Sequence, residues 1–248
     1  MNICFVLPVF TRQPQGGYKM VFEYANRLTE KNHKVKILLL NDIAVRKFCL
    51  PEPIRKLGAN ILTAIEPRWF HLDRRVEKIS GYHRNLVRKL SDIDIAIATS
   101  VNTVAPTKKL FASIPKAYFI QDYETWICDE DVVQQSYRDG LINIVISNYL
   151  KDIVEKYAGK QPILIKNPVD INFYQVIKPI ESRKKHSVSL LYHTKEHKGV
   201  KYALEALNAL REKYPDLNVE MFGIFPAPVT LPSWIHYTKG ATPEQVLE

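Results

Sequence analysis

The sequence has few cysteines, few glycines and no long apolar run. Three cysteines, Cys4, Cys49 and Cys128, are scattered over 248 residues without CxxC spacing. This odd, unpaired set argues against a disulfide framework and a zinc site, so we expect a reducing cytoplasmic compartment and no bound metal. The N-terminal run MNICFVLPVF has no basic start and is broken by Pro8. It predicts a first strand and neither a signal peptide nor a membrane span.

The sequence also lacks a GxGxxG motif. The first predicted strand, 3–7, is followed by a long loop from Pro8 to two adjacent glycines, Gly16 and Gly17, which open a predicted helix. This spacer is too long for the compact dinucleotide turn, which disfavours a hydride-transfer enzyme. Two glycines at a helix start nevertheless allow a ligand to approach backbone N–H groups.

Short apolar segments alternate with helix-length segments over the first two thirds of the chain. We predict strands over 3–7, 35–40, 93–98, 117–120, 142–146 and 163–165, and helices over 17–31, 103–111 and 147–157. Between the second and third strands we expect a short helix over 54–57 and another strand over 59–63. Strands separated by helices predict βαβ units and therefore an α/β fold with a parallel sheet.

The alternation stops over a charged segment and then restarts. We assign 1–172 to a first Rossmann-like domain, 173–186 to a linker, and 187–248 to the start of a second such domain. In the second domain the pattern predicts strands over 188–192, 219–222 and 235–238, and a capping box at Thr242 that starts a helix. A sheet lacking its closing helices would expose an apolar face. We therefore expect Glu248 to be a truncation.

Positive charge is concentrated in one region. Between residues 46 and 89 there are eleven Lys or Arg against four Asp or Glu. The segment 67–90 predicts a basic amphipathic helix that could lie on an anionic membrane, with contacts from Trp69, Phe70, Arg74, Arg75 and Lys78. The alternative is that its apolar stripe packs on the sheet. Nucleic acid is not an expected partner, because no nucleic-acid-binding motif is present.

A basic loop links the first strand and helix of the second domain. It contains His193, Lys195, Lys198 and Gly199, so that cationic side chains and the unpaired N–H groups of a helix start converge there. This arrangement predicts a phosphate site. The alternative is a solvated, lysine-rich loop.

Polar residues also gather at one edge of the predicted first sheet. Because the carboxyl ends of parallel strands meet at one edge, Gly16, Gly17, Gln121, Asp122 and Glu124 should lie there together. The carboxylates could orient sugar hydroxyls or assist proton transfer. Alternatively, Asp122 or Glu124 caps a neighbouring helix.

The order of several short motifs resembles that of retaining glycosyltransferases of family 4, which have the GT-B architecture of two Rossmann-like domains. The matching features run from end to end of the chain: Gly16-Gly17 after the first strand, Gln121-Asp122 where the family often has His-Asp, the helix start 147–151, the turn 167–170, Lys198-Gly199, Gly223 and the segment from Gly240.

The resemblance implies that a nucleotide-sugar donor binds the second domain and an acceptor binds the first, without a metal or cofactor. Together with the sheet-edge and basic-loop patterns, it leads us to expect catalytic roles for Gln121, Asp122 and Glu124, and donor contacts from Gly16, Gly17, His193, Lys195, Lys198, Gly199 and Gly223. Lys198 matches the lysine that contacts the donor diphosphate, whereas His193 stands where the family commonly has arginine. The family's pair of glutamates would fall after Glu248, so we expect the chain not to transfer sugar by itself.

Two functional hypotheses follow. The first is a cytoplasmic hexosyltransferase, peripheral on the inner face of the plasma membrane, that builds a cell-surface polysaccharide or glycolipid on a glycan or lipid-linked acceptor. The second is a non-catalytic module, derived from such a fold, that docks on a membrane or a partner. An epimerase of similar two-domain shape fits less well.

Overall fold

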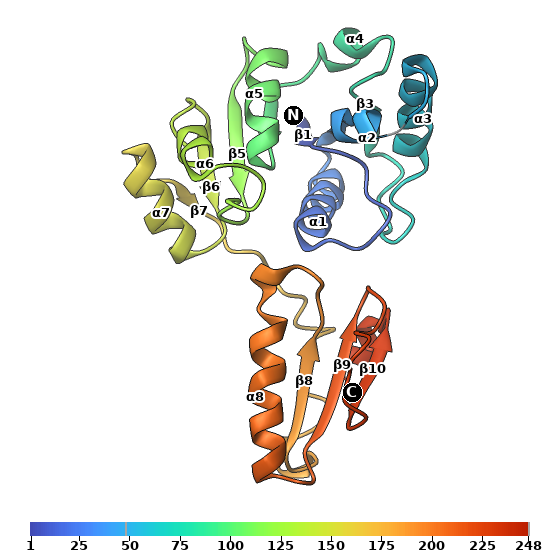
Figure 1. Cartoon of the computed structure of the whole chain (residues 1–248). Helices are drawn as coiled ribbons and strands as arrows, with labels where there is room; N and C mark the ends of the chain where they lie inside the picture. The colour runs from blue at the N-terminus through green and yellow to red at the C-terminus, as the bar shows by residue number, and fades with distance from the viewer. Residues whose placement is uncertain (48, 248) are drawn as a thin grey trace. The chain divides into compact units, whose positions relative to one another are not determined.

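The computed structural model describes residues 1–47 and 49–247. Phe48 and Glu248, and with Glu248 the predicted truncation point, lie outside the described residues. The chain forms two compact units, Met1–Asn167 and Pro168–Glu248 (Figure 1). The unit boundary falls shortly before residue 172, where the sequence pattern places the end of the first domain.

The first unit is an α/β structure built on a parallel sheet. Within its described residues the sheet has seven strands in the order β3-β2-β1-β4-β5-β6-β7. The strands are β1 (Asn2–Leu7), β2 (Lys34–Leu39), β3 (Glu77–Ser80), β4 (Ile95–Ala98), β5 (Lys116–Ile120), β6 (Ile142–Val145) and β7 (Ile163–Leu164). The helices are α1 (Gly16–Glu30), α2 (Asp42–Lys47), α3 (Glu52–Ile65), α4 (Leu86–Leu90), α5 (Val101–Leu110), α6 (Glu130–Ser136) and α7 (Asn148–Ala158).

Strand β1 is buried on both faces, as its continuous apolar sequence predicts. Ile3, Phe5 and Leu7 pack in a core cluster with Phe22 of α1. The alternate residues Cys4 and Val6 lie in a second cluster that includes residues of α4 and the end of α5. Helices therefore cover both faces of the sheet. Alternate side chains of β1 point to opposite faces, so this one strand contributes to the cores on both sides.

The strand order reverses direction beside β1. This strand pairs with β2 on one side and with β4 on the other, both in parallel. The connection after β1 runs toward β2, whereas β4 begins the other half of the sheet. In open parallel sheets, ligands bind outside the carboxyl ends of the strands at such a reversal. The loops after β1, β4 and β5 therefore define the edge at which a site is expected.

Two sequence predictions in this unit are wrong. The region predicted as a short helix and a strand over 54–63 is one helix, α3, and the long basic helix predicted over 67–90 does not form. Residues of that segment instead form a connecting loop, strand β3 and the short α4. Strand β3 adds to the sheet by pairing with β2, and this non-local pairing overrides the helical periodicity. Helices α2 and α6 are also missing from the sequence prediction.

The described part of the second unit is a three-stranded parallel sheet in the order β10-β9-β8. Its elements are η1 (Ile180–Ser182), β8 (Ser187–Leu191), η2 (Glu196–Lys198), α8 (Val200–Lys213), β9 (Asn218–Gly223), β10 (Ile235–Lys239) and α9 (Pro243–Leu247). Leu207 of α8 packs against Val219 and Met221 of β9. The Thr242 and Gln245 side chains accept each other's backbone N–H groups, so the predicted capping box forms.

The other face of this sheet is more polar than the sequence pattern predicts. Ser189, Glu220 and His236 are exposed and occupy one row across the three strands. The ring Nδ1 of His236 lies 2.7 Å from a carboxylate oxygen of Glu220. The expectation of an apolar uncovered face is therefore wrong for this row, because the inward positions of the strands hold the apolar side chains.

Candidate functional site

The first unit brings Gly17 and Gln121 together at the carboxyl edge of its sheet. Gln121 follows β5, and its side-chain Nε2 donates a hydrogen bond to the Gly17 carbonyl oxygen at 3.1 Å. Gly16 is open: a Cβ there would meet no atom within 4 Å. Helix α1 has no side-chain hydrogen bond at its N-cap, Gln15, and no acidic residue in its first turn. An anionic or hydroxyl ligand could therefore reach the first N–H groups of α1.

The two candidate carboxylates at this edge have different surroundings. Asp122 is exposed, and its Oδ1 accepts the backbone N–H of Tyr123 at 2.9 Å. Glu124 is held at the start of α5, where its Oε2 accepts the Val101 N–H at 2.6 Å. The Tyr118 hydroxyl donates to the same oxygen at 3.3 Å. Glu124 thus makes the helix-capping contact that was the alternative to a catalytic role, while Asp122 faces solvent.

Burial of Glu124 has an electrostatic consequence. Desolvation raises the pKa of its carboxyl above the ordinary value, and the nearby Asp122 carboxylate acts in the same direction. The hydrogen bond from the Val101 N–H opposes this shift. Two carboxylates at one sheet edge therefore differ in solvation, and the solvated Asp122 is the one accessible to a ligand.

Three residues that the sequence analysis did not assign to the site hold the loop between β1 and α1. The Tyr18 hydroxyl donates to the Val9 carbonyl at 2.7 Å. The Trp69 indole Nε1 donates to the Thr11 carbonyl at 3.3 Å. The fully buried Asn41 accepts the Phe10 N–H at 3.1 Å. Only Asn41 carried a local sequence signal, since asparagine directly after a strand favours a left-handed conformation, and its φ is 65°.

The predicted membrane contacts are divided between the core and the surface. Trp69 and Phe70 pack against Phe22 of α1, with ring centroids 5.8 and 5.4 Å away. The Lys78 ammonium donates to the carbonyls of Ala64 and Glu66 at the end of α3. The two aromatic residues are therefore not free interfacial anchors.

The two arginines of this segment stay at the surface. Arg74 and Arg75 are exposed, and Arg75 pairs with Asp73 through two nitrogens, at 2.7 and 3.0 Å. This pairing lowers the pKa of Asp73 to about 2. Of the three predicted basic contacts, Arg75 is thus paired locally and Lys78 is bound to backbone carbonyls, whereas Arg74 is exposed.

In the second unit, the loop between β8 and α8 contains the predicted phosphate site. Lys195 and Lys198 are exposed, and the Nδ1 of His193 accepts the Lys195 N–H at 3.0 Å. The His193 ring also packs edge-on to Phe225 after β9, with centroids 4.9 Å apart. The loop therefore holds His193 at the carboxyl end of the sheet, with two lysines exposed nearby in the chain.

Gly199 forms the junction of this loop with α8. Its φ of 70° lies in the left-handed region, which glycine adopts without steric cost. As N-cap of α8 it offers no side chain to the first N–H groups, and the first turn has no acidic residue. The start of this 14-residue helix is thus uncapped by the protein's own side chains and carries the positive end of the helix dipole.

Gly223 ends β9 where the backbone approaches closely. A Cβ at this position would lie 2.6 Å from the Tyr192 carbonyl oxygen and 3.2 Å from the Tyr237 hydroxyl. The Gly223 carbonyl accepts the Gly240 N–H at 2.7 Å. Gly223 is therefore needed for the close packing of the end of β9 against Tyr192 and Tyr237, and a role in donor binding stays a prediction.

The candidate residues are divided between the two units. Gly16, Gly17, Gln121, Asp122 and Glu124 belong to the first unit, and His193, Lys195, Lys198, Gly199 and Gly223 to the second. In residues 1–47 and 49–247, no cluster of three or more His, Cys, Asp or Glu has a metal-binding arrangement. In the same ranges, no helix combines the length and apolar character of a membrane-crossing segment.

The fold is similar to those of several solved glycosyltransferases. HepE from Anabaena, solved with UDP-glucose, superimposes with a TM-score of 0.65 and 12% identity, covering 100% of this chain and 71% of HepE. Starch synthase IV from Arabidopsis thaliana, bound to ADP and acarbose, gives a TM-score of 0.58 at 11% identity, covering 97% of this chain and 74% of the synthase domain.

A third similar structure is TarM from S. aureus in complex with UDP, fondaparinux and α-GlcNAc-glycerol. Its TM-score is 0.57 at 8% identity, and the match covers 90% of this chain and 72% of TarM. No protein-family model matches the sequence, and no curated protein matches it. At these identities the similarity establishes the fold: the chain has the α/β fold of GT-B glycosyltransferases.

Proposed function

We propose that this protein is a glycosyltransferase that uses a nucleotide-sugar donor. The observation that carries the proposal is the match of the whole chain to HepE, which is solved with UDP-glucose. The second unit supplies a chemically suitable donor site at its first βα turn, where exposed Lys195 and Lys198 precede the uncapped start of α8. Fold and loop chemistry thus support the same class of ligand.

The donor diphosphate would be bound by charge and by backbone N–H groups. The dipole and unpaired N–H groups of a helix start favour an anion. During transfer the bond between the anomeric carbon and the diphosphate oxygen breaks, so negative charge develops on the leaving diphosphate. Lys198 would neutralise this charge, and electrostatic stabilisation of this kind is commonly a large contribution to catalysis.

His193 would bind the diphosphate less strongly than the arginine that the family commonly has at this position. Because its Nδ1 accepts the Lys195 N–H, the ring proton of the neutral form is on Nε2. An imidazole lacks the planar, bidentate fork that an arginine offers to a phosphate group. We therefore expect Lys195 and Lys198, more than His193, to compensate the diphosphate charge.

The acceptor would bind the first unit at the carboxyl edge of its sheet, beside Asp122. A new bond forms between the anomeric carbon and an acceptor hydroxyl, and the hydroxyl proton must leave. The exposed carboxylate of Asp122 is suited to orient that hydroxyl or to receive its proton. Glu124 would act indirectly, because it holds the start of α5.

The motif order supports a finer assignment within this proposal. It favours a retaining hexosyltransferase of the family 4 type, located in the cytoplasm, that extends a cell-surface polysaccharide or glycolipid without a bound cofactor. The competing hypothesis of membrane docking through 67–90 loses its structural basis, since that segment forms no amphipathic helix.

Donor binding gives the most direct test, because it requires no knowledge of the acceptor. We expect UDP, ADP, GDP or dTDP, or one of their sugars, to raise the melting temperature of the full chain. Lys198→Ala should abolish the shift. The matched control is Lys213→Ala, an exposed lysine at the opposite end of α8.

Two results would contradict the proposal. One is the absence of a melting shift with all four nucleotides and their sugars at millimolar concentration. The other is a shift that Lys198→Ala leaves unchanged, which would place the ligand elsewhere. A docking module without donor chemistry predicts the first result.

A further inference from the structure

Helix α3 packs with its polar and small residues inward and its large aliphatic residues outward. Its exposed residues after the initial Glu52 are all apolar: Pro53, Ile54, Leu57, Ile61, Ala64 and Ile65. Its buried residues are Ala59 and Thr63. Surface helices ordinarily place the apolar stripe toward the core. This helix does the opposite, so its outer face has an unfavourable contact with water.

Specific hydrogen bonds hold α3 in this orientation. The Thr63 hydroxyl accepts from the buried Asn41 amide at 2.8 Å. The Asn60 amide donates to the Tyr82 carbonyl at 3.4 Å. The Arg55 guanidinium donates to the Val45 carbonyl of α2 at 2.5 Å. Rotating α3 to bury its aliphatic face would break this polar network, so the outward stripe is a stable feature of the fold.

The stripe is continuous along one side of the helix. Ile54, Leu57, Ile61 and Ile65 follow at steps of three and four residues, and 53%, 59%, 50% and 41% of their respective surfaces are exposed. A helix of 14 residues spans roughly 21 Å. Leu50, just before α3, is 52% exposed and extends the apolar surface. We call these five residues the α3 stripe.

Cations lie at both ends of the α3 stripe. Arg46 and Lys47, in α2, are exposed before its start. Arg12 and Arg68 are mostly exposed at its other end, where they lie 3.9 and 4.0 Å from Glu66, the residue after α3. This single, nearly buried carboxylate faces two guanidinium groups, so net positive charge remains.

An anionic lipid surface matches this combination of groups. Two copies of a chain with a net charge of +9 would repel each other across cation-flanked faces. An aliphatic helix face with flanking Lys and Arg is the pattern of helices that lie in the headgroup region of a bilayer.

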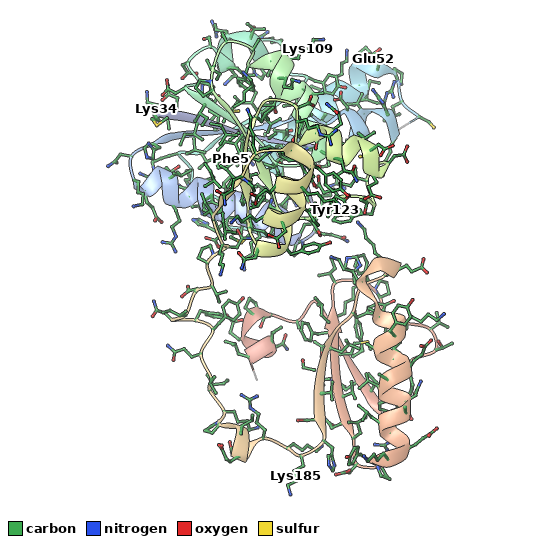
Figure 2. All side chains as sticks on the ribbon, turned by 90° about the vertical axis from the view of Figure 1, so that its left-hand side faces the viewer. Phe5, Lys34, Glu52, Lys109, Tyr123 and Lys185 are labelled. Carbon is green, nitrogen blue, oxygen red and sulfur yellow. The ribbon has the colours of Figure 1, made fainter. Side chains whose placement is uncertain are left out.

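We propose that the α3 stripe is a membrane-docking surface for a bilayer containing anionic lipid. Figure 1 shows α3 at the margin of the first unit, outside β3, and Figure 2 labels Glu52 at the start of the helix on the periphery. Lys56 near the start of α3 lies over the ring of Tyr82, which follows β3. The start of α3 therefore lies beside the loop that follows β3.

Vesicle flotation tests the proposal with the full chain. Vesicles of phosphatidylcholine alone are compared with vesicles containing about 30% phosphatidylglycerol, a fraction in the range of anionic membranes. We expect flotation with the anionic vesicles and weakening by salt. Leu57→Gln combined with Ile61→Gln should lower the partition coefficient at least about tenfold, because apolar contact with the acyl region is lost.

Two further variants separate apolar from charge contributions. Arg46→Gln with Lys47→Gln should weaken binding to anionic vesicles by roughly fivefold for each cation removed. Val87→Gln with Val229→Gln replaces two aliphatic residues that are 82% and 102% exposed outside the stripe, and it should float like the wild type. Circular dichroism confirms that each variant folds, which the exposed positions predict.

The proposal is overturned by absence of flotation with anionic vesicles, or by equal flotation of the wild type and the Leu57→Gln/Ile61→Gln variant. Sedimentation analysis provides a separate check. A dimer that this variant converts to a monomer would assign the stripe to a second copy of the chain instead.

Discussion

The side-chain amide of Gln121 donates a 3.1 Å hydrogen bond to the carbonyl oxygen of Gly17, joining the loop after β5 to the first turn of α1. The two residues are 104 positions apart in the chain. Strand β5 is separated from β1 by β4, so the contact crosses the point at which the strand order reverses. It fixes one wall of the candidate acceptor site.

Replacing Gln121 should loosen this wall without unfolding the protein. We expect Gln121→Leu to lower the free energy of unfolding by about 0.5–1.5 kcal/mol, the net contribution of one hydrogen bond. Urea denaturation followed by circular dichroism measures the change. Gln15→Leu is the control, because that exposed glutamine makes no capping hydrogen bond with its side chain. Equal effects of the two substitutions would show that the Gln121 contact is not stabilising.

Replacing Gly223 or Gly16 by alanine should change the stability of the protein differently. Gly223→Ala would place Cβ 2.6 Å from a backbone oxygen, so it should destabilise the chain by about 1–3 kcal/mol. Gly16→Ala meets no atom within 4 Å and lies in the first turn of α1, so it should be neutral or stabilise by up to about 1 kcal/mol. Thermal unfolding of both full-length variants measures this. A stable Gly223→Ala protein would contradict the close approach of Tyr192.

The buried amide of Asn41 should be essential for the loop after β1. It accepts the Phe10 N–H and donates to Thr63 and Ser80, so Asn41→Ala leaves buried polar groups unpaired. We expect a loss of about 2–4 kcal/mol in unfolding free energy.

Asn41→Gly separates the amide from the backbone conformation. Glycine tolerates the φ of 65° but lacks the side chain. If the amide contacts dominate, the glycine variant should be nearly as unstable as the alanine variant, and urea denaturation distinguishes the two. Recovery of wild-type stability in the glycine variant would assign the effect to backbone strain alone.

The raised pKa of Glu124 predicts a pH dependence of stability. The ordinary value is 4.5, and desolvation raises the pKa in the folded chain. The folded state therefore binds this proton more tightly than the unfolded state, and its contribution to stability is full below pH 4.5 and is lost as the pH rises through the folded pKa. Glu124→Gln keeps an oxygen for the Val101 N–H and removes the titration.

We accordingly expect the stability difference between Glu124→Gln and the wild type to shift in favour of the variant as the pH rises from 4.5 to neutrality. Urea denaturation at several pH values measures the difference. Glu124→Asp, which keeps the charge but shortens the reach to Val101, is the control. A pH-independent difference between Glu124→Gln and the wild type would contradict the desolvation of this carboxyl.

Much of the central fold could be predicted from local sequence. The strands around 3–7 and 117–120 are buried apolar runs, and Ser147 accepts the Leu150 N–H at the start of the predicted helix over 147–157. The strand-end rule also predicted correctly that the loops of Gly17 and Gln121 meet. These features follow from residue type and from the alternation of strands and helices, which can both be read from the sequence.

The segment 67–90 shows where local pattern fails. Its helical spacing of apolar residues competes with pairing of Lys78 and Ile79 to Ile37 and Leu38 of β2, and that pairing is non-local. The role of Glu124 was ambiguous for a similar reason. A carboxylate after a strand can serve a ligand or a helix start, and only the position of the Val101 N–H favours the second.

Residue type and period are enough to predict that helices alternate with buried strands, that the sheets are parallel, and that cations precede α8. The direction that the aliphatic side of α3 faces depends on contacts between residues distant in the chain. Periodicity gives a helix one aliphatic side but not its direction, and the bond between Asn41 and Thr63 turns that side outward. Contacts between distant residues set this orientation, and with it the exposed α3 stripe.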